Sequence, residues 1–120
     1  LRSIFKDRYR ILEAENGREA LELLEQEAYH VDIILLDLVM PEMDGLQFLT
    51  KKQQIPELEH IPVVIITADD TTEQQIDTMR MGADEYIIKP FIAEIVTRRV
   101  ENVLNSSRSL RKVLQESNLE

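Results

Sequence analysis

The stretch VDIILLDLVMPEMDG, Val31–Gly45, decides the fold of this chain. Its first part, Val31–Leu36, is almost entirely apolar and predicts a buried strand. The chain then turns at Pro41 and again at Asp44-Gly45. Asp37 stands between the strand and the first turn. A stiff core strand that delivers a carboxylate at its end holds that group in one place, which indicates a functional site.

The rest of the chain repeats this pattern of an apolar run followed by a stretch with helical signals. The predicted strands are Tyr9–Ala14, Val31–Leu36, Pro62–Thr67 and Glu85–Ile88. Continuously apolar strands that alternate with helices imply a parallel sheet with both faces covered. We therefore predict an open α/β sheet in a single domain, since 120 residues fit one core.

Capping patterns mark where the helices begin and end. Asn16 with Glu19 forms a capping-box signature, and Asp70 with Glu73 repeats it for a later helix. Gly82 is predicted to end that later helix as a left-handed C-cap.

The composition is that of a globular chain, with 43% hydrophobic and 31% charged residues and a formal net charge of −9. Acidic residues dominate residues 1–90, which hold nineteen Asp/Glu against nine Lys/Arg. Such a body repels phosphate backbones, so nucleic-acid binding is not expected. No apolar run is long enough for a membrane span. The lack of cysteine excludes thiolate metal sites and fits a cytoplasmic location.

Three predicted strands lead into side chains of complementary chemistry: Asp37, Thr67 and Lys89. Because ligands of open α/β sheets lie at the carboxyl ends of the strands, we expect these side chains to converge. An oxygen nucleophile, a hydroxyl donor and an ammonium group suit a phosphoryl group. Each residue alone is also ordinary in its place, as a solvated strand end, a strand threonine or an extended surface lysine.

Four segments resemble the receiver domain of response regulators: ENG…AL (Glu15–Leu21), LLDLVMPEMDG (Leu35–Gly45), ITA (Ile66–Ala68) and GADEYIIKPF (Gly82–Phe91). The likeness covers about residues 1–105. It implies a flavodoxin-like, doubly wound parallel sheet and a role in phosphorelay signal transduction. The implied partners are a histidine kinase and an output domain or downstream protein.

The resemblance assigns roles to five residues. Asp37 would be the phosphoacceptor, which takes a phosphoryl group from a histidine kinase. Thr67 would hydrogen-bond one phosphoryl oxygen, and Lys89 would pair with another. The backbone carbonyl of Val39 would be a Mg²⁺ ligand beside Asp37. Tyr86 falls at the position of the family's aromatic switch residue, and the bond from Lys89 to the next proline is implied to be cis.

The sequence departs from the family at the first strand, which in receivers ends in an acidic pair that completes the magnesium site. Here Leu1–Asp7 is typical of the end of a helix, and no strand precedes it. Asp69 and Asp70 follow a different strand and do not replace the pair. We therefore expect weak magnesium binding and poor phosphorylation of this chain.

The resemblance to receivers implies that the absent strand would lie between Tyr9–Ala14 and Val31–Leu36. Unpaired buried backbone groups each cost about 1–3 kcal/mol, so a simple hole is unfavourable. We expect the natural polypeptide to start earlier. For the chain as it stands, we expect either direct pairing of the two flanking strands or a strand exchanged from a second chain.

Other functional classes fit less well. Haloacid-dehalogenase-like phosphatases also place a nucleophilic Asp at a strand end, but they need an acid two residues later, where this chain has Val39. A flavodoxin-like cofactor protein would need a Ser/Thr-rich phosphate loop, and none is present. The stronger alternative is a receiver-like protein-interaction module that is never phosphorylated.

Phosphorylation is expected to draw the Thr67 hydroxyl toward the phosphoryl group and to open space for the Tyr86 ring. The surface that responds would comprise the helix that starts near Asp70, the strand Glu85–Ile88 and a last helix that starts just after Pro90. Ile76 and Met79 are predicted to be almost the only apolar anchors of the helix that starts near Asp70.

Residues 106–120 are predicted to form a helical extension or linker beyond a receiver domain at residues 1–105. A seam that starts inside the domain runs into this extension at alternating spacings of four and three, a pattern typical of a coiled coil that is interrupted by the polar Ser107: Val96, Val100, Val103, Ser107, Leu110 and Leu114. The seam indicates a homodimer or a connection to an output domain. A last helix that overruns into a frayed tail is an equal alternative.

Overall fold

A computed structural model describes residues 2–27, 30–39 and 45–119, with side chains described for 3–27, 30–39 and 45–107. The described strands are β1 (Ile34–Leu36), β2 (Val63–Thr67) and β3 (Glu85–Ile88). They form a parallel sheet in the order β1-β2-β3. The predicted turns at Pro41 and at Asp44 lie outside the described residues, and so does Leu1, the first residue of the predicted helix end.

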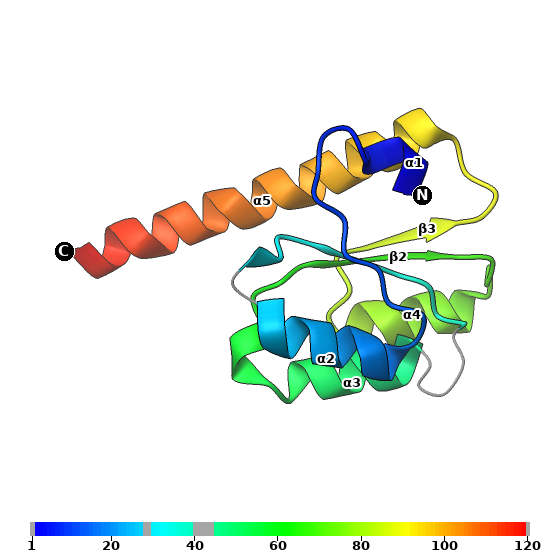
Figure 1. The fold of residues 1–120 in the computed structure, drawn as a ribbon, viewed down its shortest axis with the longest axis horizontal. Helices are drawn as coiled ribbons and strands as arrows, with labels where there is room; N and C mark the ends of the chain where they lie inside the picture. Colours follow the sequence, from blue (N-terminus) through cyan, green and yellow to red (C-terminus); the bar gives the residue numbers. More distant parts are fainter. Residues whose placement is uncertain (1, 28–29, 40–44, 120) are drawn as a thin grey trace.

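Helices cover both faces of this sheet (Figure 1). On one face lie α2 (Gly17–Glu27), α3 (Gly45–Gln53) and α4 (Thr72–Arg80), and the short helix η2 (Pro56–Leu58) follows α3. On the other face lie α1 (Arg2–Phe5) and the long helix α5 (Ala93–Leu119). The predicted open, doubly wound α/β architecture is therefore confirmed. No helix in the described part of the chain is long and apolar enough to cross a membrane.

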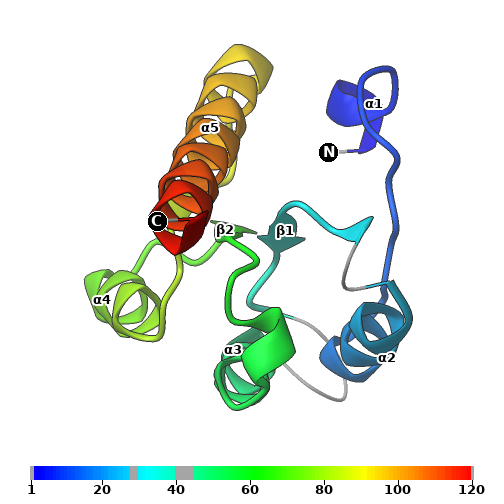
Figure 2. The same cartoon turned by 90° about the vertical axis from the view of Figure 1, so that its left-hand side faces the viewer.

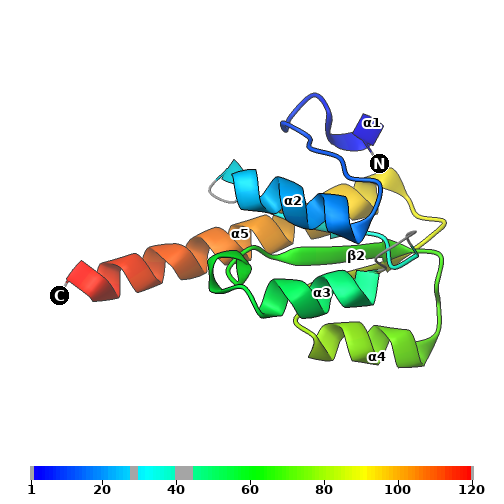
Figure 3. The same ribbon diagram turned by 60° about the horizontal axis from the view of Figure 1, so that its bottom comes forward.

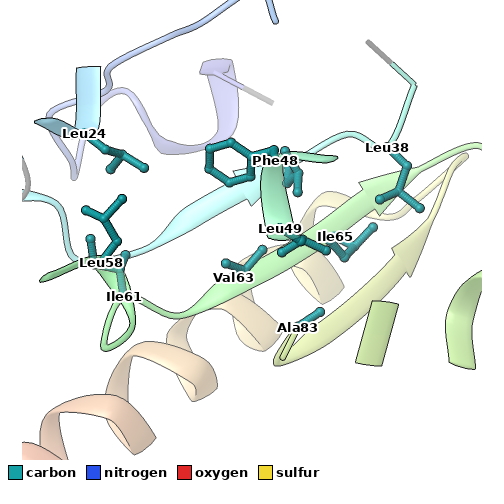
Figure 4. Packing of buried hydrophobic residues seen from close by; sticks show 10 residues of the cluster. Leu24, Leu38, Phe48, Leu49, Leu58, Ile61, Val63, Ile65 and Ala83 are labelled. Carbon is teal, nitrogen blue, oxygen red and sulfur yellow. The ribbon is translucent and has the colours of Figure 1, made fainter. Parts of the chain in front are cut away.

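The central strand β2 divides its side chains between two cores. Val63 and Ile65 face a cluster with α2 and α3, whereas Val64 and Ile66 face a cluster with α5. This alternation is the period of two that any strand imposes, applied to a strand that is apolar on both faces. Figure 4 shows the first cluster, where Phe48 of α3 is fully buried. The apolar side chains of β2 therefore belong to the hydrophobic clusters on both faces of the sheet.

The predicted strand Tyr9–Ala14 is wrong, since residues 10–14 have no regular secondary structure. Figure 2 shows this segment running on the far side of β1 from β2. Tyr9 and Ile11 pack against the α5 cluster, and Arg8 Nη1 lies 2.7 Å from Glu101 Oε1 of α5. The segment is thus held by side chains rather than by a backbone ladder, and direct pairing with β1 is also wrong.

Strand β1 is hydrogen-bonded along one edge only within the described residues. The Ile34 N–H donates to the Pro62 carbonyl at 2.9 Å, which orients the Ile34 backbone groups toward β2. In a parallel ladder the next residue points the opposite way, so the N–H and carbonyl of Leu35 face outward. The strand that leads to Asp37 therefore has an open outer edge.

The capping predictions are partly confirmed. The Asn16 side chain accepts from the Glu19 N–H at 2.9 Å, and Gly82 has a φ of 98°, as expected of a left-handed C-cap. Asp70, however, is not the N-cap of α4. Asp69 Oδ1 accepts from the N–H and hydroxyl of Thr71, and that fixes Thr71 as the N-cap, which accepts from Gln74 N–H.

Helix α5 crosses residue 105 without a break and extends beyond the sheet, as Figures 1 and 3 show. Val96 and Val100 are buried against the sheet, and Val103 packs against the same cluster, so the first half of the predicted seam belongs to the domain core.

Lys52 in the last turn of α3 is a buried charged residue with only 6% of its surface exposed. Its ammonium group donates to the Glu59 carbonyl at 3.4 Å. Burial lowers the pKa of Lys52, while the nearby carboxylates of Asp84 and Glu59 act in the opposite direction. The folded protein therefore binds this proton less tightly than the unfolded chain does.

This burial predicts a pH-dependent contribution to stability. The free energy of unfolding should rise as the pH increases from the lowered pKa of Lys52 toward the ordinary lysine value of about 10.4. The variant Lys52→Met should lose this rise, because it has no proton to release. Urea unfolding at about pH 8 and about pH 10 measures it. Lys51→Met, at the exposed neighbouring position, should keep the rise, and equal slopes in both variants would contradict the prediction.

Candidate functional site

The three side chains predicted to converge do meet at the carboxyl ends of the strands. Asp37 directly follows β1, Thr67 ends β2, and Lys89 directly follows β3. Lys89 Nζ lies 3.0 Å from Asp37 Oδ2, although 52 positions separate the two residues in sequence. Thr67 is fully buried. The parallel register of the sheet thus brings a carboxylate, a hydroxyl and an ammonium group to one edge.

The Asp37 carboxylate is surrounded by donors. Its Oδ1 accepts from the Val39 N–H at 3.1 Å, its Oδ2 accepts from Lys89, and the Thr67 hydroxyl donates to the same group. Partial burial raises the pKa of Asp37, but these hydrogen bonds lower it, and the net pKa lies below the ordinary value. The side chain is therefore ionised at neutral pH, as an oxygen nucleophile requires.

The backbone beyond Asp37 is fixed by a close approach. The Gly45 N–H donates to the Leu38 carbonyl at 3.0 Å. A Cβ atom on Gly45 would lie 2.7 Å from the Leu38 Cα, which is too close for any side chain. Because it has no side chain, Gly45 lets α3 begin directly beside Leu38, the residue that follows Asp37.

A chain of hydrogen bonds leads from Asp37 to Tyr86 through Asp69. The Thr67 hydroxyl, which donates to Asp37, also accepts from the Asp69 N–H at 3.4 Å. The Tyr86 hydroxyl in turn donates to the Asp69 carbonyl at 2.6 Å. Sequence reasoning missed Asp69 as a link because its part is made by backbone atoms, for which residue type gives no signal.

Tyr86 itself is half-buried and packs against the cluster that contains Phe48. Burial raises the pKa of Tyr86, and the nearby carboxylates of Asp69, Asp70 and Asp37 raise it further. The phenol therefore stays protonated and keeps its donor role at neutral pH. The Lys89-Pro90 peptide bond is cis, as the resemblance implies.

The described residues do not fit a complete magnesium site. Among them, no group of three or more His, Cys, Asp or Glu residues could hold a metal ion. Asp37 is the one carboxylate aimed at the strand ends by β1, and its oxygens already bind Lys89 and the Val39 N–H. A Mg²⁺ ion prefers six oxygen ligands in octahedral geometry, which this set does not supply.

Comparisons with known proteins match the chain to receiver domains. The chain is 39% identical over 101 residues to a Vibrio cholerae protein named "Probable cyclic di-GMP phosphodiesterase", covering 84% of this chain and 22% of that protein. It is 38% identical over 104 residues to the transcriptional regulatory protein SrrA of Staphylococcus aureus, covering 87% of this chain and 41% of SrrA. The chain thus spans less than half the length of these curated relatives.

A solved structure gives the same result. The signal receiver domain of a signal transduction histidine kinase from Syntrophus aciditrophicus superposes with a TM-score of 0.77 at 29% identity, covering 88% of this chain and 79% of that one. Residues 1–101 match the family described as "Response regulator receiver domain". With its parallel α/β sheet and its matched residues, this chain belongs to the response regulator receiver domain family of two-component signalling.

Proposed function

We propose that Asp37 is the phosphoacceptor of this receiver and that a histidine kinase is its phosphodonor. The convergence of Asp37, Thr67 and Lys89, with Lys89 Nζ 3.0 Å from the carboxylate, carries the proposal. A carboxylate oxygen attacks the phosphorus of the phosphohistidine, and the P–N bond breaks. The product is an aspartyl phosphate, and the imidazole nitrogen recovers its electron pair and then takes a proton.

The two neighbouring side chains supply charge and hydrogen bonding. Lys89 already faces the carboxylate, so its ammonium group is placed to pair with a phosphoryl oxygen once the phosphoryl group replaces that contact. The Thr67 hydroxyl is buried and donates toward Asp37, so it can donate to a second phosphoryl oxygen. Both groups stabilise the negative charge that develops on the phosphoryl oxygens during the transfer.

A direct test is incubation with acetyl phosphate and magnesium, followed by intact mass. An aspartyl phosphate adds about 80 Da and is discharged by hydroxylamine, as expected of an acyl phosphate. Absence of any gain would favour the alternative, a receiver-like interaction module that is never phosphorylated. That alternative draws support from the described residues, which hold no complete metal site. A haloacid-dehalogenase-like hydrolase is disfavoured because Val39 offers no general acid.

Magnesium, which receiver domains typically bind, is expected to bind this chain weakly. Asp37 and the Val39 carbonyl alone would provide too few oxygen ligands, and Lys89 competes for the carboxylate. Isothermal calorimetry should show dissociation in the millimolar range or no heat. Lys89→Met should bind magnesium somewhat better, because removing the ammonium group frees Asp37 Oδ2. Tight binding to the unaltered chain would contradict this expectation.

The surface formed by α4, β3 and the start of α5 is proposed to respond to phosphorylation. It carries five exposed large apolar side chains: Ile76, Met79, Ile88, Ile92 and Ile95. The hydrogen-bonded chain from Asp37 through Thr67 and Asp69 to Tyr86 joins the acceptor to this surface. Phosphorylation should strengthen the contact of Tyr86 with Asp69, and amide exchange of residues 72–80 should slow. Unchanged amide exchange of residues 72–80 would contradict the proposed switch.

The extension of α5 is proposed to join two receivers or to lead to an output domain. Its continuous helix carries the seam positions Leu110 and Leu114 beyond the core residues of α5. Light scattering of the full chain should report a dimer, and a chain cut after Asn105 should report a monomer. An equal molar mass per particle for the two chains would mean that the extension does not join two receivers. We further propose a cytoplasmic location, and no direct nucleic-acid contact by this domain.

A further inference from the structure

Helix α4 is held to the rest of the molecule by little apolar contact. The predicted anchors Ile76 and Met79 are 44% and 45% exposed, so that prediction is wrong. The side chain of α4 that is fully buried is Thr78, whose hydroxyl donates to the carbonyls of Gln74 and Gln75. Because its own helix satisfies the hydroxyl, this small residue can face the sheet. Burial of one threonine provides much less attachment than an apolar stripe would.

Polar contacts hold both ends of α4 instead. At its start, the Asp69 carbonyl accepts from the Tyr86 hydroxyl. At its end, the carbonyl of the C-cap residue Met81 accepts from the side-chain amide of Gln53 in α3. The same amide lies against Gly82, since a Cβ atom on that glycine would be 3.1 Å from Gln53 Nε2. The last carbonyls of a helix lack hydrogen-bond donors within the helix, so the Gln53 amide supplies the Met81 carbonyl with a donor from outside it.

The α3 side of this second contact is a fixed frame. Helix α3 buries Phe48, Leu49 and Lys52, and the Lys52 ammonium group also ties its last turn to the Glu59 carbonyl. Gln53 is the next residue, at the end of the same turn. A firmly packed helix thus holds a loosely packed one, so the amide positions α4 relative to α3 and not the reverse.

We propose that Gln53 is a positioning residue that sets where α4 lies and thereby keeps the Tyr86 hydroxyl on the Asp69 carbonyl. The two contacts bracket one helix, so releasing its C-terminal end lets the N-terminal end shift away from Tyr86. This inference rests on the proposed switch for its biological meaning. Its physical content concerns the unphosphorylated chain alone, so it is tested independently of phosphoryl transfer to Asp37.

The test compares Gln53→Glu with Gln54→Glu. The first variant keeps the side-chain shape but replaces the donor with a carboxylate, which repels the Met81 carbonyl at a helix C-terminus. The second places the same charge one residue later, where no hydrogen bond to α4 is formed in the described part of the chain. Amide exchange and the ring resonances of Tyr86, assigned with Tyr86→Phe, are measured in the full unphosphorylated chain.

We expect the amides of residues 72–80 to exchange about tenfold faster in Gln53→Glu and the Tyr86 ring resonances to move. Gln53→Met, which lacks both donor and charge, should give the same shifts. It replaces Gln53→Glu as the test variant if the Glu variant fails to fold. Gln53→Arg, which restores a donor, should reverse them. The proposal is overturned if Gln53→Glu and Gln53→Met both match Gln54→Glu, or if β2 loses as much protection as α4 while the Tyr86 resonances stay unchanged.

Discussion

Asp37→Asn removes the whole mass gain of about 80 Da that acetyl phosphate is expected to produce in the unaltered chain. The amide is nearly the same shape as the carboxylate, but its one oxygen can accept from either the Val39 N–H or Lys89 and not from both, because these two donors bind different oxygens of Asp37. What it lacks is the anionic oxygen that attacks phosphorus. The change is therefore all-or-none for phosphorylation, whereas its effect on folding is small because the side chain is partly exposed.

The matched controls are Asp32→Asn and Asp69→Asn. Asp32 is exposed and precedes the same strand, and the Asp69 carboxylate binds Thr71 rather than facing the strand ends. Both variants should retain the gain. Because phosphorylation of this chain is expected to be poor, the readout is the presence or absence of the shifted peak and not its height. A shifted peak that persists in Asp37→Asn would move the acceptor to another residue.

Phe48→Ala is expected to lower the free energy of unfolding by about 3–5 kcal/mol. Phe48 is fully buried in the cluster shown in Figure 4, so removal of its ring leaves a cavity in the core. Such a loss is a large share of the total of about 5–15 kcal/mol that holds an ordinary domain together.

Urea titration measures this loss as a shift of the unfolding midpoint. Ile92→Ala is the control, because Ile92 is 64% exposed and removing its side chain leaves no cavity. Its effect should stay within about 0.5 kcal/mol. Equal midpoints for the two variants would mean that the cluster around Phe48 does not carry the stability assigned to it.

The convergence of Asp37, Thr67 and Lys89 could be predicted because parallel strands deliver their last residues to a common edge. Apolar runs and their order along the chain were enough for that inference. The strand bounds were predicted well for β3, which matches Glu85–Ile88, and less well for β1, which is shorter than expected. Burial marks a strand in the sequence, but only hydrogen bonding to a neighbour defines where it begins.

The failures share a physical cause, which is that each depended on a partner that the local sequence does not encode. Residues 10–14 have the composition of a strand, but Ile11 packs against the α5 cluster and no ladder forms. Ile76 and Met79 have the spacing of core residues, but Thr78 faces the sheet in their place. Asp70 fits the capping-box pattern, but the Asp69 carboxylate binds Thr71, and Thr71 is the N-cap of α4 instead.

The open outer edge of β1 makes this chain a ready-made acceptor for a synthetic strand. A short extended peptide that docks beside Leu35 would satisfy the outward N–H and carbonyl and would end next to Asp37. Such a peptide would add a second ladder to β1 and would place its own last residues beside the Asp37 carboxylate. The same edge is a hazard in concentrated solution, where β1 of one molecule can template the next.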